Sequence, residues 1–138
     1  MSEESTTPDL VELSRQAFQA VIGRDFDTVE GFYAPDAVLR GAEIGTFEGT
    51  AAIRGLFEDM LSSYEEFHGE IEEIVSLGNG VIFVVITANG RPVGSSGEVR
   101  LRYATVIMWA EGVIEQQTNY VDIHEARAAA ERLAEEQE

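Results

Sequence analysis

Residues 98–122 read EVRLRYATVIMWAEGVIEQQTNYVD, and this stretch decides the fold. It holds two runs rich in residues that favour extended backbone, 98–110 and 113–122, separated by Glu111 and Gly112. Two strands joined by so short a connection pair as an antiparallel hairpin. The sequence therefore predicts two long antiparallel strands in this part of the chain.

Two earlier runs have the same composition, at residues 67–77 and 81–88, and glycine-containing connections separate all four runs. The connections have the length of hairpin turns and loops, so the four runs predict an antiparallel meander. The residues before this meander have instead the apolar spacing of helices. Helices followed by strands are typical of an α+β fold in which the helices cover one face of the sheet.

Three helices are predicted before the strands. The first begins with Thr7 as its N-cap, followed by proline at the first helical position, and ends at Gly23. The second is short, because Asp27 and Glu30 have the spacing of a capping box and Pro35 ends it. Both have an apolar stripe along one side, as expected of helices that pack on a sheet.

The third helix has the strongest periodicity in the chain. It follows a glycine-rich segment at residues 41–49, which predicts a loop or small hairpin after a short extended piece at 37–39. Thr50 is expected to cap this helix. The apolar residues recur at the spacing of one helical face, and they are Ile53, Leu56, Phe57, Met60, Leu61 and Tyr64.

A fourth, alanine-rich helix is predicted at the C-terminal end, where Asp122 and Glu125 again have capping-box spacing. We expect this helix to be an exposed tail at residues 124–138, and the polar residues 1–6 to be disordered. The folded part is then a single domain at residues 7–123. A chain of 138 residues has room for one ordinary domain.

Charge is distributed very unevenly between the two signs. Nine arginines, no lysine and 26 acidic residues give a formal net charge of -17. Nucleic acids and anionic membranes would be repelled, and neither a signal peptide nor a membrane-spanning run is recognisable. We therefore expect a cytoplasmic protein with neither as a partner. A well-solvated surface explains the acidity most simply, and residence in a saline cytosol is the alternative. The lack of cysteine excludes disulfides and thiolate sites.

Several short motifs resemble one family in their order and spacing. They are Gly23-Arg24-Asp25-Phe26-Asp27, Phe32-Tyr33-Ala34-Pro35-Asp36-Ala37-Val38, Phe47-Glu48-Gly49, and the ending Gly112-Val113-Ile114 followed by Tyr120-Val121-Asp122. In these motifs the chain resembles a SnoaL-like member of the nuclear transport factor 2-like superfamily, over residues 9–123. The resemblance implies a cone in which three helices pack on a strongly curved, mainly antiparallel sheet around a pocket. It also implies a homodimer through the convex sheet face.

Alternation along residues 98–110 predicts which side chains face the inside of the cone, because the apolar set should face inward. The resemblance puts Gln117, Asn119 and Val121 of the last strand inside as well. The expected ligand-binding lining is therefore Tyr33, Tyr103, Thr105, Trp109, Gln117 and Asn119. A mostly apolar wall with a few neutral polar groups suits a hydrophobic small molecule. For the aromatic residues, ordinary core packing is the competing interpretation.

The residues that two activities of this superfamily require are missing. When the motifs are matched, Ala17, Gly41 and Thr105 occupy the positions of the tyrosine and the two acids of a steroid isomerase. Asn119 stands in the place of the inward aspartate of the epoxide hydrolases, and residues 84–88 offer neither member of their Arg/Asp pair. An amide cannot act as a general base. Neither activity is therefore expected.

Two residues remain as candidates for a catalytic proton transfer, Tyr33 and Glu43. Glu43 lies in the glycine-rich loop near the expected mouth and would act only if the loop folded inward, so an exposed glutamate is the simpler interpretation. His68 begins a strand with an acidic face and is expected to be exposed, and His124 has no evident role. No cluster of metal-binding side chains falls on one predicted face, so neither a metal site nor a cofactor is expected.

These observations lead to two hypotheses. The first is a pocket protein that binds or transforms a hydrophobic polyketide-, terpenoid- or steroid-like compound by cofactor-free acid/base chemistry, as an isomerase, cyclase or dehydratase. The second is a non-catalytic dimeric module for ligand binding or assembly with a filled or ligand-free cone, and the missing charged groups favour it. In both, Arg100 and Arg102 would pair across the dimer axis with Glu98 or Asp122. The expected dimer surface mixes apolar and charged residues of the convex face, namely Arg100, Arg102, Val106, Met108, Thr118 and Tyr120.

Overall fold

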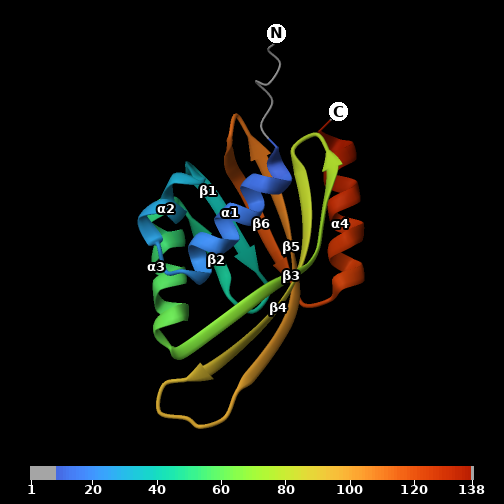
Figure 1. The fold of residues 1–138 in the computed structure, drawn as a ribbon. Coiled ribbons are helices and arrows are strands. Elements are labelled where there is room, and N and C mark those ends of the chain that lie inside the picture. The colour runs from blue at the N-terminus through green and yellow to red at the C-terminus, as the bar shows by residue number, and fades with distance from the viewer. Residues whose placement is uncertain (1–8, 138) are drawn as a thin grey trace.

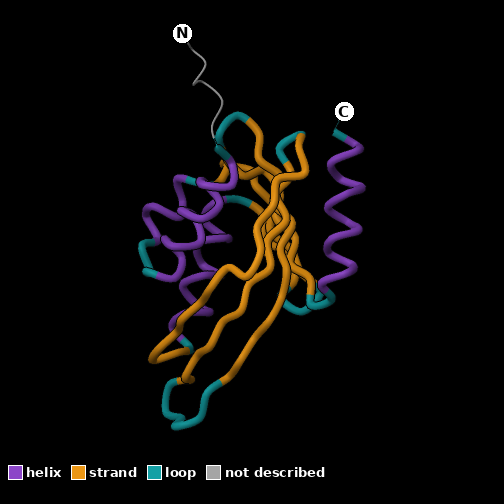
Figure 2. Tube along the Cα trace, turned by 45° about the vertical axis from the view of Figure 1, so that its right-hand side comes forward, coloured by secondary structure: helices purple, strands orange, loops and turns teal. Residues whose placement is uncertain are grey.

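A computed structural model describes residues 9–137 of the chain. In this range one six-stranded sheet has helices α1, α2 and α3 on one face and helix α4 on the other (Figure 1). Figure 2 shows the sheet between the two groups of helices. None of these helices has both the length and the apolar character to cross a membrane. The elements are α1 (Leu10–Ile22), α2 (Phe26–Gly31), β1 (Tyr33–Gly41), β2 (Gly45–Glu48), α3 (Thr50–Ser62), β3 (Tyr64–Gly78), β4 (Val81–Pro92), β5 (Val99–Ala110), β6 (Val113–Tyr120) and α4 (Ile123–Glu136).

The strands lie in the order β2-β1-β6-β5-β4-β3. β3 to β6 form the predicted antiparallel meander and β1 pairs with β2 in a hairpin, while β1 joins the meander by parallel pairing with β6. The register of β3 against β4 shifts at three places. Irregularities of this kind bend a strand and increase its twist. The sheet is accordingly curved, with its concave face toward α1, α2 and α3 (Figure 2), and the α+β prediction is confirmed.

The concave face carries the main hydrophobic core. Ile82, Val84 and Ile86 of β4 and Ile107 and Trp109 of β5 pack there with the apolar stripes of α1, α2 and α3. These residues form one alternating face of each strand, as the pleat of a sheet requires. The predicted inward face of β5 is therefore confirmed.

Helix α4 covers the convex face, where the sequence predicted an exposed tail. Ala126, Ala130 and Ala134 are buried in a second core that includes Phe83 of β4 and Val106 of β5. Alanine side chains are short enough to let the helix lie close to the sheet. Because both faces of β4 are covered, its first six residues are all buried, without the alternation of a half-exposed strand.

Polar contacts hold α4 at both ends. Asp122 is its N-cap, as predicted, and accepts a hydrogen bond from a backbone N–H of the first turn at 3.0 Å. At the other end, the Asn79 Nδ2 group donates to the backbone oxygen of Ala134 at 2.8 Å. Between them, Arg127 forms an ion pair with Glu73 at 2.8 Å. The helix is thus an integral part of the folded domain.

Three predicted helix starts differ from those in the structure. α1 is capped by Asp9, and the predicted cap Thr7 lies outside the described residues. α2 is capped by Asp25, two positions before the predicted Asp27, because the Asp25 carboxylate is the one that accepts from a first-turn N–H at 3.3 Å. Thr50 is the first residue of α3 rather than its cap, and its hydroxyl donates to a backbone oxygen of β1 at 3.1 Å.

Other boundaries are also shifted. α2 ends at Gly31, and the predicted terminator Pro35 lies inside β1, where the register against β6 shifts. Proline lacks the backbone N–H that regular strand pairing uses, and it is tolerated here because the pairing is interrupted at this point. Tyr64 begins β3 instead of closing α3. Val121 follows the end of β6 and is 68% exposed, so it does not lie inside the cone as expected.

Candidate functional site

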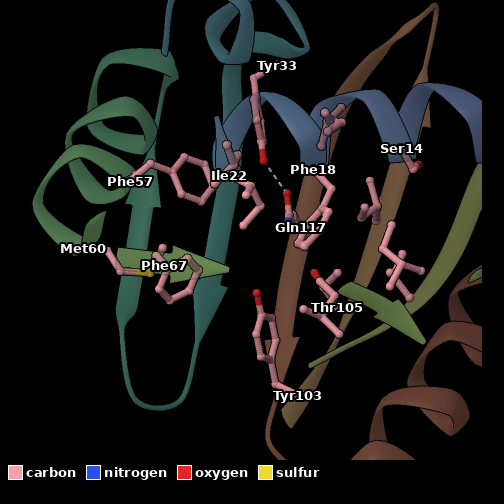
Figure 3. A pocket seen from close by; sticks show the side chains of 17 residues that line it. Ser14, Phe18, Ile22, Tyr33, Phe57, Met60, Phe67, Tyr103, Thr105 and Gln117 are labelled. Carbon is pink, nitrogen blue, oxygen red and sulfur yellow. Dashed lines mark hydrogen bonds between the residues drawn. The ribbon is translucent and has the colours of Figure 1, made fainter. Parts of the chain in front are cut away.

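A cavity of about 70 Å³ lies inside the cone, between the concave face of the sheet and helices α1 and α3. The helices contribute mainly apolar side chains, and the strands contribute most of the polar groups (Figure 3). The cavity is lined by Ser14, Ala17, Phe18, Val21, Ile22, Tyr33, Phe57, Met60, Phe67, Ile71, Val84, Ile86, Tyr103, Thr105, Ile107, Ile114 and Gln117.

The cavity is small because large side chains fill much of the cone. Phe18 of α1, Phe57 and Met60 of α3, and Phe67 of β3 all border it. One water molecule needs roughly 10–15 Å³ of such volume, whereas pockets for drug-sized ligands have about 300–1,000 Å³. The cavity therefore admits several waters or a small organic molecule. A compound with several rings requires these side chains to move.

Tyr33 and Gln117 make the most sharply defined polar contact in the cavity. The Tyr33 hydroxyl donates to Gln117 Oε1 at 2.5 Å (Figure 3). Parallel pairing of β1 with β6 brings these two residues together, since Tyr33 lies opposite Ile114. Tyr33 is only 7% exposed, and burial, with a smaller effect of Tyr103, raises the pKa of its phenol far above the usual range. The phenol therefore stays protonated and acts as a donor.

Tyr103 comes from β5 and directs its hydroxyl into the cavity (Figure 3). Residues 9–137 supply no hydrogen-bond partner for this hydroxyl. Burial raises the pKa of Tyr103 to about 12, so this phenol also stays neutral. Thr105, two residues further along the same face, uses its hydroxyl to donate to the backbone oxygen of Thr118 at 3.3 Å. Of these two predicted contacts, Tyr103 is the one with a hydroxyl available to a ligand.

Trp109, a predicted ligand contact, belongs to the core and does not line the cavity. It is 4% exposed, and its Nε1 group donates to Ser14 Oγ at 3.0 Å. The ring of Phe32 packs edge-on against it, with the centroids 6.4 Å apart. For this residue, ordinary core packing was the better interpretation.

Asn119 and Glu43 also lie outside the cavity lining. Asn119 pairs with Gly41 and Thr105 in the sheet, and its Oδ1 atom is buried without a hydrogen-bond partner in the described part of the chain. Glu43 is exposed in the turn between β1 and β2. The loop therefore does not fold inward, as a proton-transfer role of Glu43 would require.

The two histidines are remote from the cavity as well. His68 on β3 and His124 in the first turn of α4 are both exposed. Over residues 9–137, no three His, Asp or Glu side chains lie close enough together to hold a metal ion.

Sequence reasoning missed the contribution of the helices to the cavity wall. Helical spacing places Phe18, Phe57 and Met60 on apolar stripes, but it does not distinguish a core residue from a cavity residue. Ser14 carried a clearer signal. It lies four residues after Leu10, on the apolar stripe of α1, and a polar residue on such a stripe needs a buried partner.

The lining is uncharged. Among the described residues that form it, none has a carboxylate, an imidazole, an ammonium or a guanidinium group. Its side-chain hydrogen-bonding groups are four hydroxyls and one amide, on Ser14, Tyr33, Tyr103, Thr105 and Gln117. Such a set can bind and orient a neutral molecule. Proton abstraction needs a base whose pKa lies near the working pH, and these neutral phenols do not provide one.

A curved sheet, helices on its concave face and an internal cavity together define a protein of the nuclear transport factor 2-like class. Within that class the chain belongs to the SnoaL-like domain family, whose sequence profile matches residues 14–117. The resemblance seen in the sequence motifs is thus confirmed. No relative was found among curated proteins.

Solved structures are similar in fold. An NTF2-like protein of unknown function from Burkholderia pseudomallei has a TM-score of 0.71 and 19% identity, over 83% of this chain and 91% of that one. A LEH-like epoxide hydrolase from M. tuberculosis has a TM-score of 0.70 and 19% identity, over 88% and 89%. A candidate SnoaL-like polyketide cyclase from Shewanella putrefaciens has a TM-score of 0.71 and 12% identity, over 92% and 98%. Identities this low establish the shared fold and leave the chemistry open.

Proposed function

We propose that this protein binds a small, neutral, mainly apolar molecule in the cavity of the cone. The observation that carries the proposal is the uncharged lining with Tyr103 and Gln117 directed into it. A ligand that carried a charge would lose its hydration there without gaining an ionic partner. Apolar surface with a few fixed polar groups is typical of sites for such molecules.

The size of the cavity favours a single-ring compound over a polyketide, terpenoid or steroid of several rings. A longer ligand would have room outside the cavity, because the inward face of β5 continues from Tyr103 to Leu101 and Val99, which are each 38% exposed. Exposed apolar side chains next to a cavity are suited to hold the remainder of a hydrophobic ligand.

Binding is better supported than catalysis. In the catalytic form of the hypothesis, Tyr33 or Glu43 would move a proton. The Tyr33 hydroxyl is engaged with Gln117 and its pKa is raised by burial, and Glu43 is exposed in a turn. Neither is placed as a general base, so the cyclase, isomerase and dehydratase alternatives lack their proton acceptor.

Native mass spectrometry of the purified protein, followed by thermal shift with single-ring and fused-ring compounds, tests this proposal. A retained compound, or a melting temperature that rises with ligand dose, supports binding. Ala17→Leu should abolish the shift, because Ala17 lines the cavity. Ala128→Leu on the exposed side of α4 is the matched control and should keep it. If no compound stabilises the protein, the alternative of a non-catalytic assembly module with a filled cone takes its place.

We also propose a homodimer, through the part of the convex face that α4 leaves uncovered. α4 already packs on Val106, Met108 and Tyr120 of the expected surface. Arg102, expected to reach a second copy, pairs with Glu72 of its own chain at 3.0 Å. Arg100 is exposed beside this pair and remains a candidate contact. Light scattering at micromolar concentration should give the mass of two chains, and a monomer mass would rule the dimer out.

A further inference from the structure

The hydrogen bond between Tyr33 and Gln117 determines what the cavity offers to a ligand. A neutral phenol has one proton to donate, and burial keeps Tyr33 neutral. Within residues 9–137, Gln117 Oε1 is the acceptor that this proton reaches, at 2.5 Å. If the amide were flipped, the Tyr33 proton would be buried without an acceptor, which costs free energy. The contact therefore fixes the orientation of the Gln117 amide.

With Oε1 engaged by Tyr33, the Nε2 group of Gln117 is left as the free end of the amide. It has two N–H donors, and the described residues provide no acceptor for either of them. Gln117 lines the cavity, and Figure 3 shows its amide at the centre of the lining. The free end of this side chain is thus a donor.

Tyr103 presents a second donor to the same space. Its hydroxyl points into the cavity from the neighbouring strand β5 (Figure 3), and the described residues leave it without a partner. The pairing of Ile107 with Gln117 places Tyr103 on the same inward face of the β5–β6 pair. Because the phenol stays protonated below a pKa of about 12, its O–H is available at every physiological pH.

We infer that the ligand carries a hydrogen-bond acceptor of the carbonyl type, such as a ketone, and that the Gln117 amide and the Tyr103 hydroxyl donate to it. Tyr33 is a positioning residue, since it acts by fixing the Gln117 amide. This inference rests on the proposed binding function and names the class of ligand. A donor-poor, acceptor-bearing molecule satisfies both groups, whereas a hydrocarbon of the same shape leaves two donors in an apolar space without partners.

Two probes of nearly the same shape test the inference, cyclohexanone and methylenecyclohexane. Their dissociation constants are measured by ligand-detected NMR on the full chain, and the readout is the ratio of the two constants. A variant that merely loosens the cavity weakens the binding of both probes and leaves the ratio of their dissociation constants unchanged. We expect Tyr103→Phe and Gln117→Leu each to shift the ratio toward methylenecyclohexane by about three- to tenfold, the value of one lost hydrogen bond. Ala128→Leu, on the exposed side of α4, should not shift it.

The role of Tyr33 has its own readout. Tyr33→Phe frees the amide of Gln117 to adopt both orientations. The infrared carbonyl band of bound cyclohexanone should therefore split or broaden. The ratio of the two dissociation constants should also shift in the same direction as for Gln117→Leu. A single unshifted band in Tyr33→Phe overturns the positioning role. If both probes bind but no variant changes their ratio, the carbonyl inference is wrong while the binding function stands. If neither probe binds the wild-type protein, the carbonyl inference is wrong, and the thermal-shift panel of single-ring and fused-ring compounds then decides separately whether the binding function stands.

Discussion

The hydrogen bond from Trp109 to Ser14 shows that the tryptophan is a core residue and not a ligand contact. Alternation along β5 correctly predicts that Trp109 faces inward, but it does not predict how deep in the cone the ring lies. Its N–H donates to Ser14 and its ring packs on Phe32, so the residue is part of the core. Tyr103, on the same face, is the one whose polar atom is left for a ligand. The sequence thus predicts the face of a strand residue better than its role.

Removing the Ser14 hydroxyl tests this assignment. Ser14→Ala leaves the Trp109 N–H buried without an acceptor, which should lower the free energy of unfolding by about 1–3 kcal/mol. Urea denaturation measures the change. Ser62→Ala is the control, because the Ser62 hydroxyl contacts a backbone oxygen at the protein surface, and it should change stability by no more than about 0.5 kcal/mol. Equal effects of the two substitutions would contradict the buried role of Ser14.

Tyr103 makes stability depend on pH in the alkaline range. Its pKa is raised to about 12 in the folded protein, so the unfolded chain loses this proton first as the pH rises. The contribution of the Tyr103 phenol to the free energy of unfolding is fully present below the ordinary tyrosine pKa of about 10. Between that pH and about 12 the contribution falls by about 1.4 kcal/mol per pH unit. Urea denaturation between pH 9 and 11.5 should therefore show a shallower decline for Tyr103→Phe than for the wild type. Parallel curves would show that burial does not shift this phenol.

A glycine on the concave face sets how closely α1 approaches the sheet. A Cβ atom at Gly69 would lie 2.8 Å from Phe18 Cζ and 3.0 Å from Ile22 Cδ1. Both atoms are side-chain ends that border the cavity and can shift into it, so Gly69→Ala should destabilise the protein only modestly, by about 1 kcal/mol. Gly55→Ala in α3 meets no atom within 4 Å and should instead stabilise by about 0.5–1 kcal/mol. Urea denaturation of both variants tests the pair, and the account fails if the two substitutions act with the same sign.

At the scale of elements, the sequence predicted the four helices and the four strands of the meander. It predicted only part of β1, left β2 open as a loop or small hairpin, and misplaced α4 in space. The signal for the position of α4 was present in β4, whose first six residues are apolar on both faces. A strand without alternation is covered on both sides, and only α4 remains to cover the second side. Cap positions were harder to predict, because Asp25 and Asp27 are both suitable residues two positions apart.

The packing of α4 predicts a sharp contrast between two of its alanines. Ala130 is fully buried against the sheet, and Ala128 is exposed on the opposite side. Ala130→Glu should lower the free energy of unfolding by more than about 3 kcal/mol, since it buries an unpaired charge or displaces the helix. Ala128→Glu introduces the same residue at a position where its charge stays in water, so it should have little effect on the free energy of unfolding. Thermal melts of the two variants measure the difference, and similar melting temperatures would mean that α4 does not pack as described.

At the scale of the whole molecule, the net charge of -17 works against the compact state. Acidic side chains repel one another, and salt screens this repulsion. The screening length falls from about 10 Å at 0.1 M salt to about 3 Å at 1 M. The melting temperature should therefore rise between low and molar NaCl, and KCl should give the same rise. A flat curve would contradict this account of the acidity and with it the hypothesis of a saline cytosol.

The family and the cone could be predicted from motifs spread over most of the chain, and so could four residues of the cavity lining, whereas the volume of the cavity could not. Its volume depends on how far Phe18, Phe57 and Phe67 extend into the cone, and no sequence pattern specifies that distance. The polar site depends on a contact between Tyr33 and Gln117, which the parallel pairing of β1 with β6 creates. Both residues were predicted to face inward, but their hydrogen bond was visible only in the structure.

The central claim is that the cavity binds a neutral, acceptor-bearing molecule, and a two-dimensional ¹H–¹⁵N NMR titration of the full chain with cyclohexanone tests it most directly. We predict dose-dependent shifts in the signals of Ser14, Tyr103 and Gln117, including the side-chain NH₂ group of Gln117. Saturation of these shifts gives the affinity. Shifts confined to exposed residues such as Val93 and Val121, or no shifts at millimolar ligand, would contradict the claim.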